Sequence, residues 1–144
     1  MLLNGTGTMT AEAARLISPL RLAYIGDTVW ELLVRLTLFG RGQNVRHMHQ
    51  GAVAGVNAGA QAAALRVLEP LLTEEETDMV RRGRNAHARH PAPRHQQPAD
   101  YQSATALETL MGYLYLTGQE ERLRQLFLAA QDTAQEVNTC PPQS

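Results

Sequence analysis

The chain has 144 residues, 44% hydrophobic and 19% charged, and a net charge of −1, which is the composition of one ordinary globular domain. Charged residues interrupt its apolar runs before they reach the ~20 residues of a membrane span, and the N-terminus lacks the basic and apolar regions of a secretory signal. The single cysteine, Cys140, cannot form an internal disulfide, so we expect a cytoplasmic protein without a membrane partner.

The first half of the chain predicts two long helical regions. Residues 11–39 are largely apolar, with a break near Pro19, and residues 46–69 are rich in small side chains and end at Pro70. The second region carries a glycine at every fourth position: Gly51, Gly55 and Gly59. On one continuous helix these glycines share a face. Since glycine costs ~1 kcal/mol in a helix interior, we expect close helix packing to offset that cost.

The second half predicts a short helix, a loop and two more helices. Residues 72–83 begin with a capping box of Thr73 and Glu76 and end at a glycine. Residues 84–99 contain three prolines and no apolar periodicity, which indicates a loop. The remaining helices are predicted over residues 100–116 and 119–137.

No segment shows the pattern of a strand, so the sequence predicts an all-α fold with a single domain. That domain is expected over residues 11–137, with residues 84–99 as its basic loop. Residues 1–10 are expected to be a disordered N-terminus, and residues 138–144 a flexible tail.

The basic residues are unevenly placed. All 13 are arginine, which can reflect a compositional bias of the source organism. The interval between Asp78 and Asp100 contains no acid, however, although it holds five arginines and three histidines. The arginines are Arg81, Arg82, Arg84, Arg89 and Arg94. A locally basic segment on a near-neutral protein predicts a surface for an anionic partner.

One carboxylate stands where the first long helix should be apolar. In "RLAYIGDTVWELL", Asp27 lies between Ile25 and Val29. A helical wheel places on its face Leu20, Ala23, Tyr24, Trp30, Val34 and Leu38. Leu22 and further apolar residues fill the opposite face, which predicts burial in the fold or against a partner subunit. Asp27 then needs a metal or a hydrogen-bonding partner, as a structural acid also would.

A second acid, Glu108, lies in "DYQSATALETLMGYLYL". Its helix face carries the small residues Thr105 and Gly112, which leave space for an ion and a substrate. The alternative is that Thr105 caps a late-starting helix and Glu108 completes a capping box. Asp100, after Pro98, is a better helix start and leaves Glu108 in the middle of the helix.

Two facing carboxylates would form a hard-oxygen site. Such a site suits Mg²⁺ with several water ligands, and Mn²⁺ accepts the same kind of ligand. Divalent ions of this kind serve phosphoryl chemistry. Because arginine binds phosphate through a planar fork, the neighbouring basic loop indicates a nucleic acid as the substrate.

Three motifs follow one another along the chain. They are "LAYIGDTVWE", "RRGRNA" and "SATALETLMGYLYLTG", within roughly residues 17–128. Their order and spacing resemble the catalytic domain of ribonuclease III, with an apolar run before Gly-Asp. The chain is most similar to the Mini-ribonuclease III family, a dimeric catalytic domain that lacks the usual double-stranded-RNA-binding domain.

The resemblance implies a homodimeric endoribonuclease that cleaves double-stranded RNA. It implies that Asp27 and Glu108 are the catalytic residues and hold Mg²⁺. It also implies maturation of the precursor of 23S ribosomal RNA. Ribonuclease III of full length has two further acids where this chain has Ala23 and Thr105. Mini-ribonuclease III shares these absences, which implies a metal shell with more water.

Without a separate RNA-binding domain, the basic interval is the expected RNA contact. Its candidate residues are Arg81, Arg82, Arg84, Asn85, Arg89 and Arg94. The alternative for Arg81 and Arg82 is that they only complement the C-terminus of a helix. The competing function is a non-catalytic RNA-binding or ribosome-assembly factor on the same fold. A module that only binds RNA does not need Asp27 and Glu108.

Overall fold

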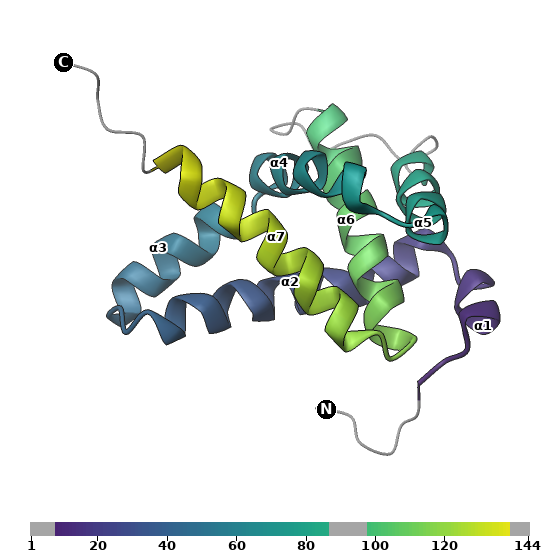
Figure 1. Cartoon of the computed structure of the whole chain (residues 1–144), viewed down its shortest axis with the longest axis horizontal. Coiled ribbons are helices and arrows are strands. Elements are labelled where there is room, and N and C mark those ends of the chain that lie inside the picture. The colour runs from purple at the N-terminus through teal and green to yellow at the C-terminus, as the bar shows by residue number, and fades with distance from the viewer. Residues whose placement is uncertain (1–7, 87–97, 139–144) are drawn as a thin grey trace.

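The computed structural model describes residues 8–86 and 98–138, most of which are helical (Figure 1). In chain order the helices are α1 (Ala11–Arg15), α2 (Pro19–Gly40), α3 (Val45–Val56), α4 (Ala58–Leu68), the 3-10 helix η1 (Glu69–Leu71), α5 (Glu74–Asn85), α6 (Pro98–Leu116) and α7 (Glu120–Asn138). The described residues contain no strand, so the predicted all-α fold is confirmed. None of these helices is long and apolar enough to cross a membrane.

Polar side chains start five of the helices. Each accepts a hydrogen bond from the backbone N–H three residues further on, and they are Thr10, Ser18, Asn44, Asn57 and Thr73. The predicted capping box is present, since Glu76 N–H donates to Thr73 Oγ1 at 3.2 Å and Thr73 N–H donates to Glu76 Oε1 at 2.9 Å. The predicted break near Pro19 is also present, between α1 and α2.

The prediction of one helix over residues 46–69 is wrong. Asn57 leaves α3 with extended backbone (φ −72°, ψ 160°) and caps α4, its Oδ1 accepting from Ala60 N–H at 2.8 Å. Its Nδ2 donates to the carbonyl oxygens of Val53 and Ala54 at the end of α3. One asparagine therefore satisfies both helix ends, and this outweighs the continuous apolar pattern.

Gly51 and Gly55 allow α3 to pack closely on α2. A Cβ added at Gly51 would lie 2.8 Å from the side chain of Leu38, and one at Gly55 would lie 2.9 Å from that of Val34. The predicted close packing is thus confirmed for these two positions. Gly59 belongs to the first turn of α4 and not to this row.

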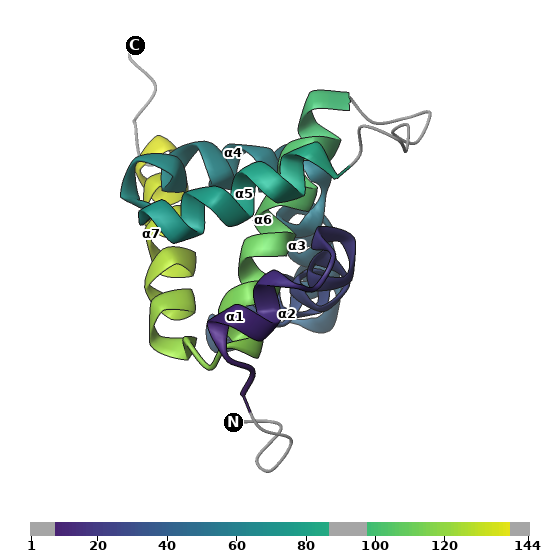
Figure 2. The same cartoon turned by 90° about the vertical axis from the view of Figure 1, so that its right-hand side faces the viewer.

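Helix α6 runs through the middle of the molecule. It packs against α2, α4, α5 and α7, and Figures 1 and 2 show it surrounded by the other helices. From Ala104 to Leu114 every residue except Glu108 is buried. Because so much of its circumference is covered, α6 has no polar face between these residues, and Glu108 is the exception that requires an explanation.

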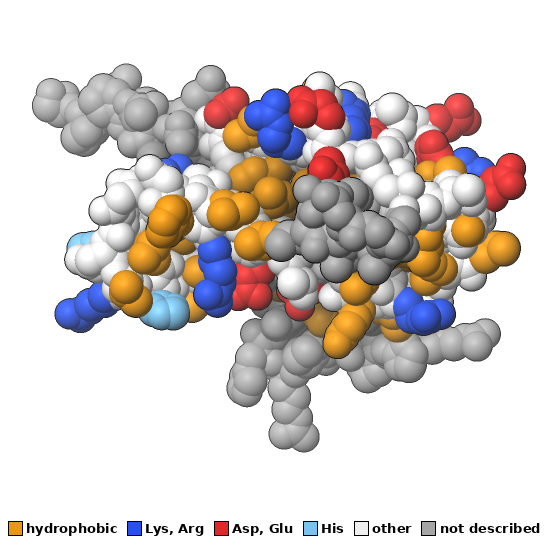
Figure 3. Space-filling model, turned by 90° about the horizontal axis from the view of Figure 1, so that it is seen from below, with side chains coloured by type: hydrophobic (Ala, Val, Ile, Leu, Met, Phe, Trp, Pro, Cys, Tyr) orange, Lys and Arg blue, Asp and Glu red, His pale blue; other side chains and the backbone are white. Residues whose placement is uncertain are grey.

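The described residues of the chain cover α2 on one side only. Its buried residues are Leu22, Ala23, Gly26, Trp30, Val34 and Leu38. Its exposed large hydrophobic residues are Leu20, Tyr24, Leu32, Leu36 and Phe39. The chain itself therefore leaves Leu20 and Tyr24, on the predicted face of Asp27, exposed, whereas Leu22 on the opposite face is in the core. The reason is that the buried side follows a ridge of every fourth residue across the neighbouring helices. Figure 3, a view toward α2 and α3, shows hydrophobic groups with charged side chains between them.

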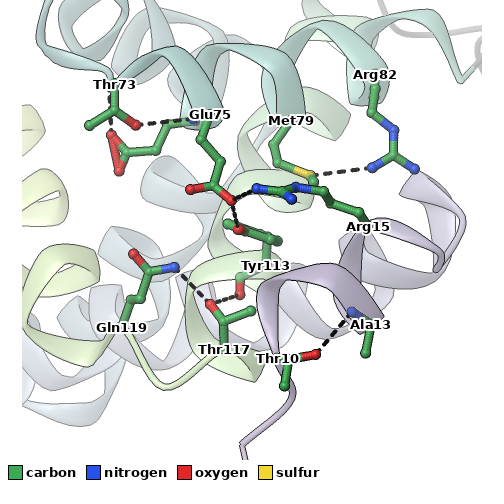
Figure 4. Close-up of polar contacts among 11 residues, drawn as sticks. Thr10, Ala13, Arg15, Thr73, Glu75, Met79, Arg82, Tyr113, Thr117 and Gln119 are labelled. Atoms are coloured by element: carbon green, nitrogen blue, oxygen red, sulfur yellow. Dashed lines mark hydrogen bonds and ion pairs between the residues drawn. The ribbon is translucent and has the colours of Figure 1, made fainter.

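Helix α1 is attached to α5 and α6 through one carboxylate (Figure 4). Glu75 on α5 accepts from the guanidinium of Arg15 at 2.5 Å and from the hydroxyl of Tyr113 on α6. Burial and the adjacent Glu75 raise the pKa of Tyr113 to about 12. Arg82 on α5 donates to the carbonyl oxygen of Ile17 at 3.2 Å, so α5 also holds the turn between α1 and α2.

Candidate active site at the crossing of α2 and α6

The backbones of α2 and α6 touch at two glycines. A Cβ at Gly26 would lie 1.6 Å from the carbonyl oxygen of Glu108, and one at Gly112 would lie 2.0 Å from that of Leu22. Neither position has room for a side chain, so glycine alone permits this crossing. Asp27 directly follows Gly26, and the contact therefore places it near Glu108.

Asp27 is exposed in this chain, so its helix face is not covered by the fold itself, and burial against a partner subunit is the predicted alternative that remains. Partial desolvation raises the pKa of its carboxyl, and the negative charge of Glu31 raises it further. Glu31 itself forms an ion pair with Arg35 at 3.0 Å, one turn along the same helix. Glu31 thus acts on Asp27 through charge while it is held by its own partner.

Glu108 is partly buried, and its pKa is raised to about 7. Burial is the first cause and the charge of Asp27 the second, while an interaction with the Gln61 amide opposes the rise. Two carboxylates that disfavour each other's ionisation attract a proton or a cation. The pair predicted from the sequence is therefore brought together, and its electrostatics fit a divalent cation.

The alternative role for Glu108 as part of a capping box is wrong. Glu108 lies ten residues into α6, which begins at Pro98. Thr105 is also inside the helix, and its hydroxyl donates to the carbonyl oxygen of Tyr101 at 3.1 Å. Thr105 therefore bonds to the preceding turn and starts no helix.

The donor set around the two acids is small. Among the described residues, no three His, Cys, Asp or Glu side chains lie close enough together to hold a metal ion. Ala23 and Thr105, where the resemblance to ribonuclease III would place acids, are both buried. A cation held by Asp27 and Glu108 would keep several water ligands, as Mg²⁺ prefers.

The basic interval is only partly described. Arg81 pairs with Asp78 at 2.5 Å, and Arg84 pairs with Glu69 at 2.6 Å, in both cases near the protein surface. Asn85 is exposed. Arg82 makes the contact with the α1–α2 turn described above. The other two candidates, Arg89 and Arg94, lie outside the described residues.

Sequence reasoning missed one polar residue beside the acids. Gln61 is 2% exposed on α4, and its amide interacts with Glu108. The signal was available, because Gln61 interrupts the apolar run "AGAQAAAL" in the same way that Asp27 interrupts its own helix. The role of Gly26 was also not predicted. In the sequence it only precedes Asp27, whereas in the structure its contact with α6 positions Asp27.

Comparison with known proteins defines the class of this one. The family model described as "Ribonuclease III domain" matches residues 20–119, which include both acids. The chain belongs to the ribonuclease III family, in its Mini-ribonuclease 3 branch, and is an endoribonuclease.

The similar relatives point to that branch. The chain is 50% identical over 117 residues to a protein named "Mini-ribonuclease 3" from Symbiobacterium thermophilum, covering 81% of this chain and 89% of the relative. It is 47% identical over 114 residues to a protein of the same name from Synechococcus sp., covering 79% and 81%. A crystal structure of a Fusobacterium nucleatum protein superposes with a TM-score of 0.75 at 30% identity, covering 83% of this chain and 96% of that one.

Proposed function

We propose that this endoribonuclease cleaves double-stranded RNA with a divalent cation, Mg²⁺ or Mn²⁺, held by Asp27 and Glu108. The observation that carries the proposal is the backbone contact at Gly26, because it sets two mutually repelling carboxylates near one another. Repelling acids have little structural value without a cation, whereas a cation lowers the pKa of both.

In this proposal both carboxylates bind the cation, but they differ in how far they are buried. Glu108 is partly buried and Asp27 is exposed, so Glu108 would bind the cation next to the core and Asp27 would bind it at the surface that RNA can approach. When bound, the ion activates a water molecule and neutralises charge on the phosphate. Hydrolysis with the 3′-oxygen as leaving group gives products with 5′-phosphate and 3′-hydroxyl ends.

The exposed apolar side of α2 supports a homodimer. A hollow of about 590 Å³ lies between α2 and α7, lined by Tyr24, Ile25, Val29, Leu32 and Leu33 together with Asp27. A second hollow of about 340 Å³ continues along α2 towards Phe39. Exposed apolar surface of this extent is typical of subunit contacts. A twofold dimer around α2 would bring two Asp27 residues to one face, one for each RNA strand.

We also propose that the basic interval binds the RNA. Its contacting residues would be Arg81, Arg82, Arg84, Asn85, Arg89 and Arg94. The ion pairs of Arg81 and Arg84 are exposed, and such pairs contribute only ~0–1 kcal/mol, so phosphate groups can replace their acids. Double-stranded RNA is read mainly through its shape, its phosphates and its 2′-hydroxyls. The cellular task that we propose is maturation of the 23S ribosomal RNA precursor, in the cytoplasm.

Incubation with duplex RNA tests the proposal. We expect internal cuts that require Mg²⁺ or Mn²⁺, stop in excess chelator, and leave 5′-phosphate ends that a 5′-phosphate-dependent exonuclease degrades. Sedimentation at micromolar concentration should give the mass of a dimer. Tight duplex binding without any cut, with both ions supplied, would favour the non-catalytic ribosome-assembly factor instead.

A further inference from the structure

A cavity of about 420 Å³ lies next to Glu108, between the start of α4 and the N-terminal half of α6. Glu108 lines it and Asp27 does not, so this cavity is distinct from the hollow along α2. Its other polar lining includes Gln61 on α4 and Asp100 on α6. The proposed function uses none of this lining except Glu108.

Gln61 is the residue that points to a ligand. It is 2% exposed, and its Nε2 makes no hydrogen bond with any group that the structure describes. The amide approaches the Glu108 carboxylate closely enough to lower its pKa, as a long hydrogen bond does, but not at a distance and angle that satisfy the donor. A buried donor left unsatisfied costs ~1–3 kcal/mol, and native proteins retain few of them. A bound acceptor at the cavity would remove that cost.

The first turn of α4 adds donors to the same cavity. Ala58 and Gly59 line it, and their N–H groups precede the first intrahelical hydrogen bonds of this 11-residue helix. The side chain of Asn57 does not serve them, because its Oδ1 accepts from Ala60. A Cβ at Gly59 would lie 3.8 Å from Asp100 Oδ2, so the donors of α4 and the carboxylate of Asp100 lie close together.

The mixture of donors and carboxylates selects the chemistry of the ligand. A phosphate would meet the carboxylates of Asp100 and Glu108, and a bare cation would meet N–H groups, so each suits only half of the lining. A hydroxyl group suits both, because it donates and accepts. On an RNA strand held at Glu108, the hydroxyl that DNA lacks is the 2′-hydroxyl.

We propose that this cavity binds a ribose of the strand that is cut, with the 2′-hydroxyl accepting a hydrogen bond from Gln61 Nε2 and donating to one of the two carboxylates. The inference rests on the proposed function and adds to it a means of selecting RNA over DNA close to the cleaved bond. Gln61 becomes a specificity-determining residue that contacts the substrate.

The test combines a protein variant with single-atom changes in the substrate. A duplex RNA with a mapped cut is compared with versions that carry one 2′-deoxynucleotide at each position within three nucleotides of the cut. Wild type should cut one of these versions about tenfold more slowly, or slower still, because the hydroxyl that is removed makes two hydrogen bonds. Gln61→Met, which keeps the volume, should cut the all-ribose duplex about three- to tenfold more slowly, because it removes one of these two bonds.

The decisive result is that these two losses do not add. For Gln61→Met, the deoxy change should slow cutting by a smaller factor than it does for wild type, since the bond between Gln61 and the hydroxyl is already absent and only the bond to the carboxylate is still lost. The melting temperature of this variant should stay close to that of wild type, because removing an unsatisfied donor and losing its weak contact with Glu108 have opposite effects. Gln125→Met, at an exposed position on α7, should change neither rate nor stability.

Two negative outcomes are distinguishable. If wild type cuts every deoxy version as fast as the all-ribose duplex, or if the two losses multiply, the ribose site is excluded and the proposed function stands. If wild type leaves the all-ribose duplex uncut with Mg²⁺ or Mn²⁺ present, both are excluded.

Discussion

The acids of the candidate site lie at the crossing of α2 and α6, and its arginines lie on the C-terminal half of α5. The two regions hold these charged groups in opposite ways. At the crossing, Gly26 fixes the backbone, and desolvation together with a neighbouring negative charge raises the pKa of both Asp27 and Glu108. On α5, Arg81 and Arg84 already have acidic partners at the surface. The two acids are therefore placed where a cation would stabilise their charged forms, whereas the two arginines can exchange one anionic partner for another.

This difference predicts where substitutions act. Changes at the crossing should alter the chemical step or the fold, with large effects. Changes on α5 should alter RNA affinity and its dependence on salt, in small increments, because exposed charges in water interact weakly.

The largest effect is expected from removing the charge of either acid. Asp27→Asn and Glu108→Gln should each reduce cleavage about a hundredfold or more, because the cation loses a ligand worth several kcal/mol at the transition state. Duplex RNA binding, measured with Ca²⁺ in place of Mg²⁺, should be retained. Glu31→Gln is the control on the same helix, since Glu31 is paired with Arg35, and it should lower cleavage by far less. An active Asp27→Asn protein would remove the crossing from the mechanism.

A methyl group at the glycine contact should act on the fold. Gly26→Ala places a Cβ 1.6 Å from the Glu108 carbonyl oxygen, so the helices must separate, and we expect a loss of ~3 kcal/mol or more in the free energy of unfolding. Gly40→Ala is the matched control at the end of α2, because a Cβ there meets nothing within 4 Å. The control should be neutral or slightly stabilising. Equal denaturant midpoints for the two variants would mean that the helices do not touch here.

The raised pKa of Glu108 should make the free energy of unfolding depend on pH. The pKa of Glu108 is raised from 4.5 to about 7 in the folded protein, so the folded chain binds a proton more tightly than the unfolded chain. Without a divalent ion, stability should therefore fall as pH rises from about 4.5 to 7, and the loss should be complete above pH 7. Glu108→Gln should match wild type near pH 4.5 and exceed it at pH 8 by on the order of 2 kcal/mol.

Thermal unfolding in chelator at both pH values measures this difference. Added Mg²⁺ at pH 8 should raise the melting temperature of wild type and leave that of Glu108→Gln nearly unchanged, since ligand binding stabilises only the protein that binds it. A flat wild-type profile between pH 4.5 and 7 would show that the pKa of Glu108 is not raised in the folded protein.

The smallest effect per residue is expected on the basic interval. Replacing Arg84, Arg89 and Arg94 together with alanine should weaken duplex affinity and reduce its salt-dependence slope by a little under one unit for each phosphate that the variant no longer binds. Arg66→Ala, an exposed position on α4, is the control. Glu69→Gln sharpens the comparison, because it frees Arg84 from its ion pair and should strengthen binding slightly. An unchanged salt titration for the triple variant would place the RNA contact elsewhere.

The two regions also differ in how far the sequence predicts them. Asp27 and Glu108 are recognisable because each carboxylate interrupts an otherwise apolar or small-residue helix. The break at Asn57 is not, since the apolar pattern continues through it and only the three-dimensional contacts show that its amide serves two helix ends. The sequence also does not indicate which side of α2 is exposed, because a helix that is apolar all round does not show which half the rest of the chain covers.

The direct contact between the backbones at Gly26 and Gly112 determines which substitutions the chain can accept during evolution. Elsewhere in the core, exchanging one aliphatic side chain for another changes the distance between two helices. Here no side chain lies between them, so the spacing of Asp27 and Glu108 is set by backbone atoms that every amino acid shares. Substitutions at most other core positions should therefore leave the distance between the two acids unchanged, whereas Gly26 and Gly112 must remain glycine.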